Sequence, residues 1–423
     1  MFNYLSAVGF RYFSIGLQFL IIVLITHHLS PADSGSYFLI FGAVSTTYYL
    51  AGVGLPDGLV KSIALKRASG ESEQVRSLVT RAAQFTAIIS FALAVVGAII
   101  GYLVGFSVLQ IAVAVAWWLC YGAVFFCAQC LLAMGWASLG SFFFYPAANS
   151  FQIALLLPFF FLVHDVGLDD VLLITVVSAL GSVVAAIICL AIVTGRLPRT
   201  IVNAPLMPAF SLGFTICVSR VLQSTLYWLP VWMVGALQGP AAASSIAVAS
   251  RLAVAVASIM AAIRFTVRPE IVAAAARGDW DEIEKIGRTI ATVASVAAFV
   301  ALIGTMVVGG EGIALIFGDA YRSATIALGI LLLGTIGECF GGPVDEVLRM
   351  TGRARFVLGL IAISVVSEAI LIMLLGGSAV SAAAAQSAVF IVMYGVFIAY
   401  VRFTNGILIV PYFSIRKFNG RRT

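Results

Sequence analysis

The stretch that decides the fold is LQGPAAASS at residues 237–245, followed by RGDWDEIEKIGRTIA at residues 277–291. The opening of the chain has the same layout, with LSPADSGSY at residues 29–37 and SGESEQVRSLVTRAA at residues 69–83. In each copy a short turn joins two apolar segments of helix length, and a charged amphipathic segment follows the second. The region from Phe210 to Arg288 is therefore predicted to repeat the fold of the chain's opening.

The two copies keep the spacing of three landmark residues, which are Arg11, Pro31 and Gly70 in the first and Arg220, Pro240 and Gly278 in the second. The arginine precedes the proline by 20 residues in both copies (31 − 11 and 240 − 220). The glycine follows the proline by 39 residues in the first copy (70 − 31) and by 38 in the second (278 − 240). Internal duplication of this kind is typical of membrane transporters built from repeats.

The composition excludes a water-soluble fold. Hydrophobic residues make up 62% of the chain and charged residues 10%, whereas soluble domains have roughly 45–50% and about 25%. Apolar runs of at least about 18 residues recur along the chain, and each is long enough to cross the hydrocarbon core as a helix. The alternation typical of barrel strands is absent. The sequence therefore predicts an all-α polytopic membrane protein.

Apolar length and turn signals predict twelve spans. Their ranges are 5–27, 37–60, 82–105, 109–134, 142–163, 171–194, 209–237, 242–265, 289–310, 323–348, 356–376 and 379–402. The charged segments Glu71–Arg81 and Asp279–Arg288 have apolar residues at helical spacing, so we expect them to form short amphipathic extensions of the spans.

Basic residues gather in the loops on one side of the predicted spans, whereas the loops on the other side contain Arg322 alone. Because basic loops stay in the cytoplasm, both termini are expected to be cytoplasmic. The outer loops are too short to form a domain, which argues against a membrane enzyme that acts outside the cytoplasm. With six spans in each half, the halves have parallel topology. We expect an N-terminal lobe at residues 1–205, a C-terminal lobe at 206–403 and a basic cytoplasmic tail at 404–423.

Several ionisable residues lie within or near the ends of the predicted spans, among them Arg11, Asp57, Arg220, Arg251, Arg264, Glu338 and Glu368. A charge near the bilayer centre costs about 2.5–3.5 kcal/mol on insertion scales, so such groups normally face an interior cavity. Guanidinium groups hold phosphate in bidentate fashion and keep their charge. One hypothesis is therefore a cationic cavity that binds an anionic substrate through the four arginines.

The alternative hypothesis is internal pairing. Arg220 or Arg251 would neutralise Glu368, and Arg264 would extend to the cytosolic surface. Glu338 and Glu368 are interpreted as counter-ions or as sites for a coupling ion. Asp57 is a further candidate for either role, although it is predicted to lie close enough to a helix end to reach the lipid headgroups.

Several uncharged polar residues are further candidates to line a cavity, namely Gln18, Tyr48, Tyr49, Gln129, Asn149, Gln152, Gln223, Tyr227 and Gln386. Buried amides also join helices by hydrogen bonds, so packing is the simpler interpretation for each of them. All six cysteines fall in apolar runs, where cysteine packs as a small hydrophobe. We expect no disulfide, metal site or cofactor.

The sequence resembles a known family in three regions. GFRYFSIGLQFLIIVLITHHLSPADSGSYFLI at residues 9–40 and the region from Val234 to Ile283 are similar to the lipid-linked oligosaccharide flippases of the polysaccharide transport family. This family belongs to the superfamily of multidrug, oligosaccharidyl-lipid and polysaccharide exporters (MOP). The stretch from Leu315 to Leu331 is also similar, and the likeness covers nearly all of the chain.

The resemblance implies two six-helix lobes and translocation of undecaprenyl-pyrophosphate-linked glycan, the repeat unit of O-antigen, lipopolysaccharide or exopolysaccharide. Translocation would run from the inner to the outer leaflet of the bacterial inner membrane. The implied partners are the lipid-linked glycan, membrane lipids and a glycan polymerase or other assembly proteins, with no nucleic acid. The chain departs from the family pattern at Gly239, Pro240 and Ala241, which lack the acidic group of Asp33. Twelve spans disfavour the branch that carries peptidoglycan precursors.

Three rival functions remain open from the sequence. A cation-coupled multidrug antiporter of the same superfamily would need membrane-embedded carboxylates, of which the N-terminal half offers only Asp57. A solute porter of the major facilitator type would carry a basic G-R-[RK] ending after its second span, which is missing here. A membrane glycosyltransferase or polymerase would need paired catalytic carboxylates, and none are found. We therefore expect a transporter without enzymatic activity.

Overall fold

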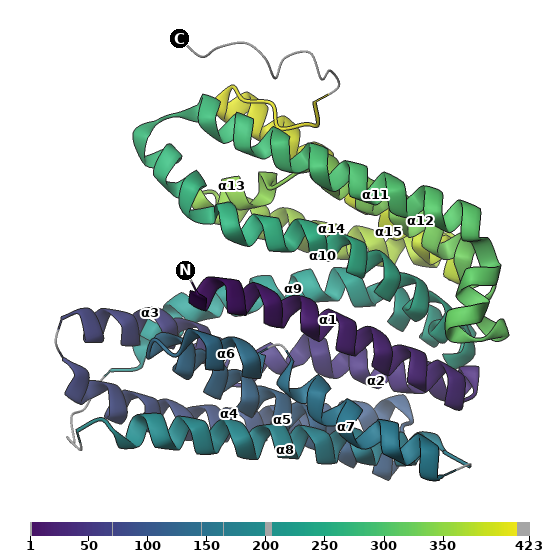
Figure 1. The fold of residues 1–423 in the computed structure, drawn as a ribbon, viewed down its shortest axis with the longest axis horizontal. Helices are drawn as coiled ribbons and strands as arrows, with labels where there is room; N and C mark the ends of the chain where they lie inside the picture. Colours follow the sequence, from purple (N-terminus) through teal and green to yellow (C-terminus); the bar gives the residue numbers. More distant parts are fainter. Residues whose placement is uncertain (1, 70, 145, 164, 199–204, 413–423) are drawn as a thin grey trace. The chain divides into compact units, whose positions relative to one another are not determined.

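The computed structural model describes residues 2–69, 71–144, 146–163, 165–198 and 205–412. Every regular element in these residues is a helix, so the predicted all-α fold is confirmed. The first nine α-helices (Figure 1) are α1 (Phe2–His28), α2 (Pro31–Thr47), α3 (Leu55–Ala68), α4 (Ser72–Val104), α5 (Val108–Ala133), α6 (Ala137–Phe144), α7 (Ala147–Leu162), α8 (Leu168–Gly195) and α9 (Met207–Gln238). A short 3₁₀ helix, η1 (Tyr48–Leu50), follows α2.

The remaining elements are α10 (Pro240–Arg277), α11 (Trp280–Phe317), η2 (Asp319–Tyr321), α12 (Ala324–Gly341), α13 (Val344–Met350), α14 (Ala354–Leu374) and α15 (Ala379–Asn405). The chain forms two compact units, Met1–Trp228 and Leu229–Thr423. Their division falls within α9 and not in the linker near residue 205, because the first part of α9 packs closely on α3. The lobe boundaries proposed from the sequence concern membrane topology and stay a prediction.

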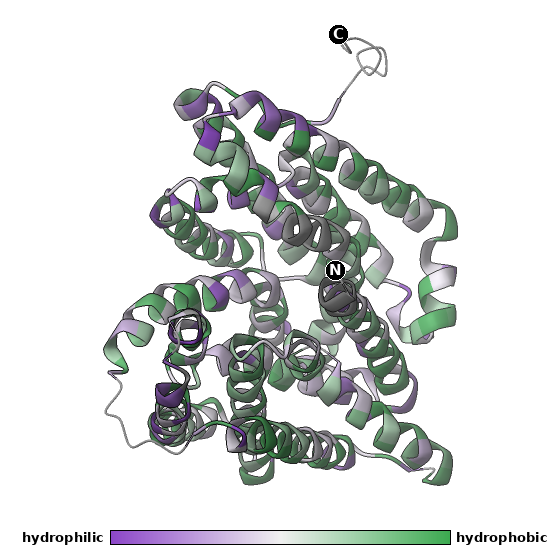
Figure 2. Cartoon of the chain, turned by 60° about the vertical axis from the view of Figure 1, so that its left-hand side comes forward, coloured by the Kyte–Doolittle hydropathy of each residue, from purple (hydrophilic) through white to green (hydrophobic). Residues whose placement is uncertain are grey.

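The number of candidate spans agrees with the twelve that the sequence predicts when each bent helix pair is counted as one span. Ten helices in the described residues are long and apolar enough to cross a membrane, and two bent helix pairs raise the number to twelve if each pair is one span. Figure 2 shows apolar residues along the central parts of the long helices and hydrophilic residues mainly at helix ends and in connections. The protein is therefore a multi-pass membrane protein.

The turn that follows α1 shows why the repeated pattern folds as it does. Ser30 caps α2 by accepting a hydrogen bond from the Asp33 N–H at 3.2 Å, and Pro31 fills the first helical position, where no N–H is needed. The second copy begins α10 with Pro240 after Gly239, which has no side chain to cap the helix. The proline is therefore the shared start signal, and the side-chain cap is present only in the first copy.

The two amphipathic segments begin long helices, as predicted. Residues 72–81 form the first turns of α4, where Val75 and Leu78 are buried. Residues 280–288 form the first turns of α11, where Ile283 is buried and the Asp279 side chain caps the helix by accepting from the Glu282 N–H at 3.0 Å. Both segments continue directly into a membrane span.

Candidate functional site

A buried ion pair in the first unit is the best-defined polar site. The Arg220 Nη2 lies 3.1 Å from the Asp57 Oδ1. The same carboxylate oxygen accepts a hydrogen bond from the Gln129 Nε2 at 2.7 Å. Three separate helices, α3, α5 and α9, thus meet at one carboxylate. The other oxygen, Oδ2, is buried and has no hydrogen-bond partner among the described residues.

A glycine-rich turn places Asp57 at this point. The predicted second span consists of α2 and α3, which are bent by 41° at the break between them. Gly52, Val53 and Gly54 form the break and have φ values of 79°, 50° and 84°. Val53 is a β-branched residue in a left-handed conformation, which is strained. The break starts a new helix inside the apolar region, and Asp57 lies in its first turn, where the helix dipole favours a negative charge.

Close packing of α9 on α3 brings Arg220 to the carboxylate. A Cβ atom added to Gly54 would lie 2.3 Å from the Gly213 carbonyl oxygen, and one added to Gly58 would lie 1.8 Å from the Ala209 carbonyl oxygen. The two backbones can approach this closely because glycine carries no side chain. Farther along α9, the Cys217 thiol donates to the Tyr49 carbonyl oxygen at 3.2 Å. One turn later the helix carries Arg220.

Aromatic rings surround the Arg220 guanidinium. Its central carbon lies 5.4 Å from the ring centroid of Tyr49 and 5.8 Å from those of Phe125 and Phe144. Tyr48 packs on Tyr49 and Phe125, with centroid distances of 4.1 and 5.6 Å. Ring faces attract a guanidinium within about 6 Å. We call Tyr48, Tyr49, Phe125 and Phe144 the aromatic cup.

The two charges of the pair differ in exposure. The Arg220 side chain is 34% exposed, whereas the Asp57 side chain is 3% exposed. Asp57 can therefore neutralise Arg220 while part of the arginine side chain stays accessible. An accessible arginine above aromatic rings is suited to bind an anion together with a flat apolar or sugar surface.

This geometry corrects one sequence prediction. Within the first unit Arg220 pairs with Asp57, a partner that the sequence did not suggest, whereas neutralisation of Glu368 by Arg220 or Arg251 stays a prediction. Asp57 is buried and paired, so the prediction that it reaches the lipid headgroups was wrong. The error arose because apolar length alone does not reveal that the second span breaks at residues 51–54 and folds Asp57 inward. The glycines at positions 52 and 54 were the signal of this break in the sequence.

Other predicted site residues have different surroundings. Arg11 is half-buried on α1 in the first unit, and Arg251 is half-buried on α10 in the second. The side chain of Arg264 lies outside the described part of the structure. Glu338 is buried and accepts a hydrogen bond from the Tyr394 hydroxyl at 3.1 Å.

Glu368 is an exception among the buried acids. It is 0% exposed on α14, and neither carboxylate oxygen has a hydrogen-bond partner among the described residues. A charge in this position would be costly unless a proton or a cation offset it. Glu368 is therefore the acid whose surroundings most favour exchange with a small cation.

Several of the polar candidates join helices. The Asn149 side chain donates to the Ser14 hydroxyl at 3.1 Å. The Gln152 side chain donates to the Tyr37 hydroxyl at 2.9 Å and to the Thr175 hydroxyl at 2.8 Å. Gln129 also joins two helices, α5 and α3, through its hydrogen bond to Asp57. Within the described residues no group of three or more His, Cys, Asp or Glu side chains is placed to hold a metal ion.

Comparisons with known proteins agree with this fold. Residues 215–374 match the MatE family model. Among solved structures, an inward-facing multidrug resistance MATE family transporter of the MOP superfamily has a TM-score of 0.74 at 14% identity, over 95% of this chain and 98% of that chain. The lipid II flippase MurJ in an inward closed conformation has a TM-score of 0.69 at 12% identity, over 94% of this chain and 87% of that chain.

An outward-facing MATE transporter of the MOP superfamily is also similar, with a TM-score of 0.63 at 14% identity over 96% of this chain and 95% of that chain. A comparison with curated protein sequences gave no match. At these identities the likeness concerns the fold. Over nearly its whole length, the chain has the fold of the MATE transporters, which a lipid flippase shares.

Proposed function

We propose that the protein is a flippase that moves undecaprenyl-pyrophosphate-linked oligosaccharide from the inner to the outer leaflet of the bacterial inner membrane. The observation that carries this proposal is the partly exposed Arg220 side chain, whose guanidinium lies over the rings of the aromatic cup within a membrane span. A pyrophosphate and its sugars cannot cross hydrocarbon unaided, because their polar groups would lose their hydrogen bonds. A cationic site with aromatic walls offers both parts of the headgroup a partner.

In the proposed mechanism Asp57 is an internal substitute for the substrate anion. The carboxylate holds Arg220 in place while the site is empty. When pyrophosphate arrives, the guanidinium turns toward its oxygens, with which it forms a two-pronged contact. Gln129 keeps a hydrogen bond to Asp57 and so limits the cost of separating the pair. Sugar rings then pack on Tyr48 and Tyr49.

The remaining arginines extend the positive field. Arg11, Arg251 and Arg264 lie on membrane helices, and each is proposed to attract the pyrophosphate as the protein alternates between inward and outward access. The repeat supports pairing Arg11 with Arg220 as equivalent positions. Both termini are proposed to be cytoplasmic, which follows from the basic loops. Other assembly proteins, such as a glycan polymerase, are proposed to receive the flipped substrate.

The coupling ion is proposed to bind in the second unit at Glu368. The acid is enclosed and has no hydrogen-bond partner among the described side chains, so a proton or small cation would stabilise it. Glu338 is a weaker candidate because the Tyr394 hydroxyl already donates to it. The sequence contains no G-x-x-x-x-G-K-[ST] loop for ATP, so an ion gradient or removal of the product supplies the direction.

The rival function is export of organic cations, which the MATE neighbours favour. Aromatic rings around a carboxylate can bind such cations. Here, however, the carboxylate is already neutralised by Arg220 at 3.1 Å, and the exposed member of the pair is the cation. A second cation would meet repulsion at this site. The charge arrangement therefore supports an anionic substrate.

The test uses the full chain in proteoliposomes with a fluorescent polyprenyl-pyrophosphate oligosaccharide. We expect Arg220→Ala to lower the rate of leaflet exchange at least tenfold and Arg220→Lys to lower it less, because lysine keeps the charge but loses the planar fork. Lys61→Ala, at an exposed position of the same unit, is the matched control. Every rate is divided by the amount of folded protein.

A parallel assay measures release of a lipophilic organic cation from the same vesicles. If the native protein moves the cation and not the glycan lipid, the antiporter is the correct function. If it moves the glycan lipid and Arg220→Ala is as fast as the control, the flippase stands but the role of Arg220 is wrong.

A further inference from the structure

The chain after α15 folds back onto α11 in the second unit. Residues 406–412, which we call the C-terminal strap, have no regular secondary structure. They begin at Gly406, which ends α15 in a left-handed conformation with φ of 73°. Ile407 is 3% exposed and Ile409 is 1% exposed. Two buried apolar side chains in so short a segment show that the strap is packed into the unit.

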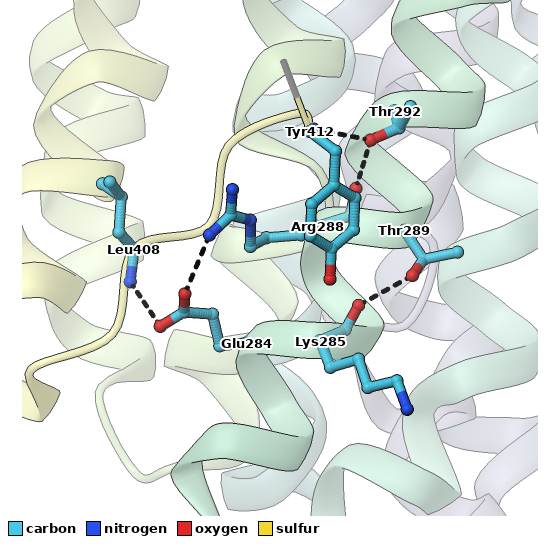
Figure 3. Close-up of polar contacts among 7 residues, drawn as sticks. All are labelled: Glu284, Lys285, Arg288, Thr289, Thr292, Leu408 and Tyr412. Carbon is cyan, nitrogen blue, oxygen red and sulfur yellow. Dashed lines mark hydrogen bonds and ion pairs between the residues drawn. The ribbon is translucent and has the colours of Figure 1, made fainter. Parts of the chain in front are cut away.

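Backbone hydrogen bonds attach the strap to two side chains of α11 (Figure 3). The Leu408 N–H donates to the Glu284 Oε2 at 3.1 Å, and the Tyr412 N–H donates to the Thr292 Oγ1 at 2.9 Å. Arg288 connects the two points, because its Nη1 donates to the Glu284 Oε1 at 3.2 Å and its guanidinium lies 4.5 Å from the Tyr412 ring centroid. The strap is thus fixed at both of its ends.

A glycine on α11 makes room for the strap. A Cβ atom added to Gly287 would lie 2.9 to 3.1 Å from three side-chain carbons of Ile409. These distances are shorter than normal van der Waals contacts. Any larger side chain at residue 287 would therefore push Ile409 out of its place, and the strap would move with it.

Cations lie on three helices that meet at the strap, because α15 ends where the strap begins, the strap bonds to α11, and the start of α14 bonds to Asn405. Lys285 lies in the second turn of α11 and Arg355 in the first turn of α14, and both are exposed. Arg402 is exposed in the last turn of α15. Arg353 joins the group, since its Nη1 donates to the Asn405 Oδ1 at 2.7 Å just before the strap begins.

The acids near these cations are mostly engaged. Glu284 binds Arg288 and the strap, Glu282 binds Arg277 at 2.6 Å, and Asp279 caps the helix. Asp281 is exposed on the first turn of α11. Among these described residues, the exposed cations therefore outnumber the acids that neither a cation nor a helix end engages.

We propose that this surface binds the headgroups of anionic phospholipids in the surrounding leaflet. Arg353, Arg355 and Arg402 lie at the ends of the spans Ala354–Leu374 and Ala379–Asn405, which is the depth of the headgroups. Phe403, 88% exposed beside Arg402, suits the boundary between headgroups and hydrocarbon. Clusters of four to eight basic residues next to a span bind anionic lipid. The inference does not depend on the proposed transport function.

The experiment measures how strongly the full chain prefers spin-labelled phosphatidylglycerol over spin-labelled phosphatidylcholine in reconstituted bilayers. The test variant carries Lys285→Gln, Arg355→Gln and Arg402→Gln. The matched control carries Lys61→Gln, Arg67→Gln and Arg196→Gln, which are exposed cations of the first unit. We expect the test variant to lose up to about fivefold in preference for each cation removed, and the control to lose much less.

A third variant, Gly287→Val, tests the strap while keeping every cation. We expect the preference to fall because the displaced strap no longer joins the end of α15 to α11, and we expect Tyr412 to become accessible to chymotrypsin. Equal losses in the test and control variants would overturn the proposal, since bulk charge alone would explain them. An unchanged preference in Gly287→Val would overturn the role of the strap. Binding of polyprenyl pyrophosphate to the same variants is also measured. If the mutations weaken that binding and leave the preference for phosphatidylglycerol unchanged, the surface belongs to the substrate instead.

Discussion

The Arg220 side chain is partly exposed, whereas its counter-ion Asp57 is buried. This difference determines how a mutation of Arg220 affects stability. Asp57 is enclosed by protein and holds two partners on one oxygen. Removing Arg220 leaves the carboxylate with Gln129 alone. An ion pair of this kind adds little net stability when intact, but breaking it is costly, because the remaining charge stays buried.

We expect Arg220→Ala to lower the free energy of unfolding by roughly 1–3 kcal/mol, less than for a fully buried pair because the arginine is partly exposed. The double variant Arg220→Ala with Asp57→Asn should recover at least half of the loss, since no charge is then left without a counter-ion. Unfolding of the purified protein in detergent measures both values. A double variant that is no more stable than Arg220→Ala would show that the charge of Asp57 is not the cause.

Glu368 gives a second prediction at the residue scale. Glu368→Gln keeps the shape of the side chain and removes its charge, so the protein should fold normally. If the acid binds the coupling ion, glycan flipping by this variant should no longer respond to an imposed ion gradient. Glu338→Gln is the matched control, because Glu338 is also buried but has the Tyr394 hydroxyl as a donor. A gradient response that persists in Glu368→Gln and disappears in Glu338→Gln would reverse the assignment.

At the scale of elements, the break between α2 and α3 and the contact of α3 with α9 build the candidate site. The contact depends on Gly54, Gly58 and Gly213, where the backbones leave no space for a side chain. Gly58 separates packing from conformational strain, because it lies inside α3 and has no positive φ. It is therefore the better position to test the contact.

We predict that Gly58→Ala destabilises the protein by about 1–3 kcal/mol, because the new methyl group overlaps the Ala209 carbonyl oxygen and forces the helices apart. Gly359→Ala on α14 is the matched control, since no atom lies within 4 Å of an added Cβ there, and it should be neutral or slightly stabilising. Thermal unfolding in detergent compares the two. Similar melting temperatures would mean that the α3 and α9 contact yields easily.

The repeat also appears in how the chain leaves each half. In the first unit the Arg76 Nη1 on α4 donates to the Leu197 carbonyl oxygen, just after α8, at 3.3 Å. In the second unit Glu284 on α11 accepts from the Leu408 N–H, just after α15, at 3.1 Å. Both amphipathic segments therefore hold the chain that follows the last helix of their half. The chain that follows α8 continues to α9, and the chain that follows α15 continues into the basic tail.

At the scale of the whole molecule, exposed apolar side chains belong to the membrane-facing surface. Leu103, Phe161 and Leu315 are examples at the ends of long helices. Such a surface would cause aggregation in water, whereas lipid covers it in the bilayer. The positions of the basic loops then decide which side faces the cytoplasm.

This orientation can be tested by labelling with a thiol reagent that does not cross membranes. We expect Ala32→Cys and Ala241→Cys to react in intact cells with a permeable outer membrane, and Ser69→Cys to react only after the inner membrane is opened. All three positions are exposed, and the six native cysteines are buried or half-buried, so the background should be low. Labelling of Ser69→Cys from outside would place the termini in the periplasm.

The sequence by itself determined the helical class and the presence of ten to twelve candidate spans, because apolar length and periodicity act locally along the chain. It also identified Arg220 and Glu368 as charges in apolar surroundings. Only the tertiary structure decided that Asp57 is the partner of Arg220, that Phe125 and Phe144 complete the cup, and that the strap returns to α11. These contacts join residues far apart in the chain, so they depend on how helices break and pack, and local composition does not encode that geometry.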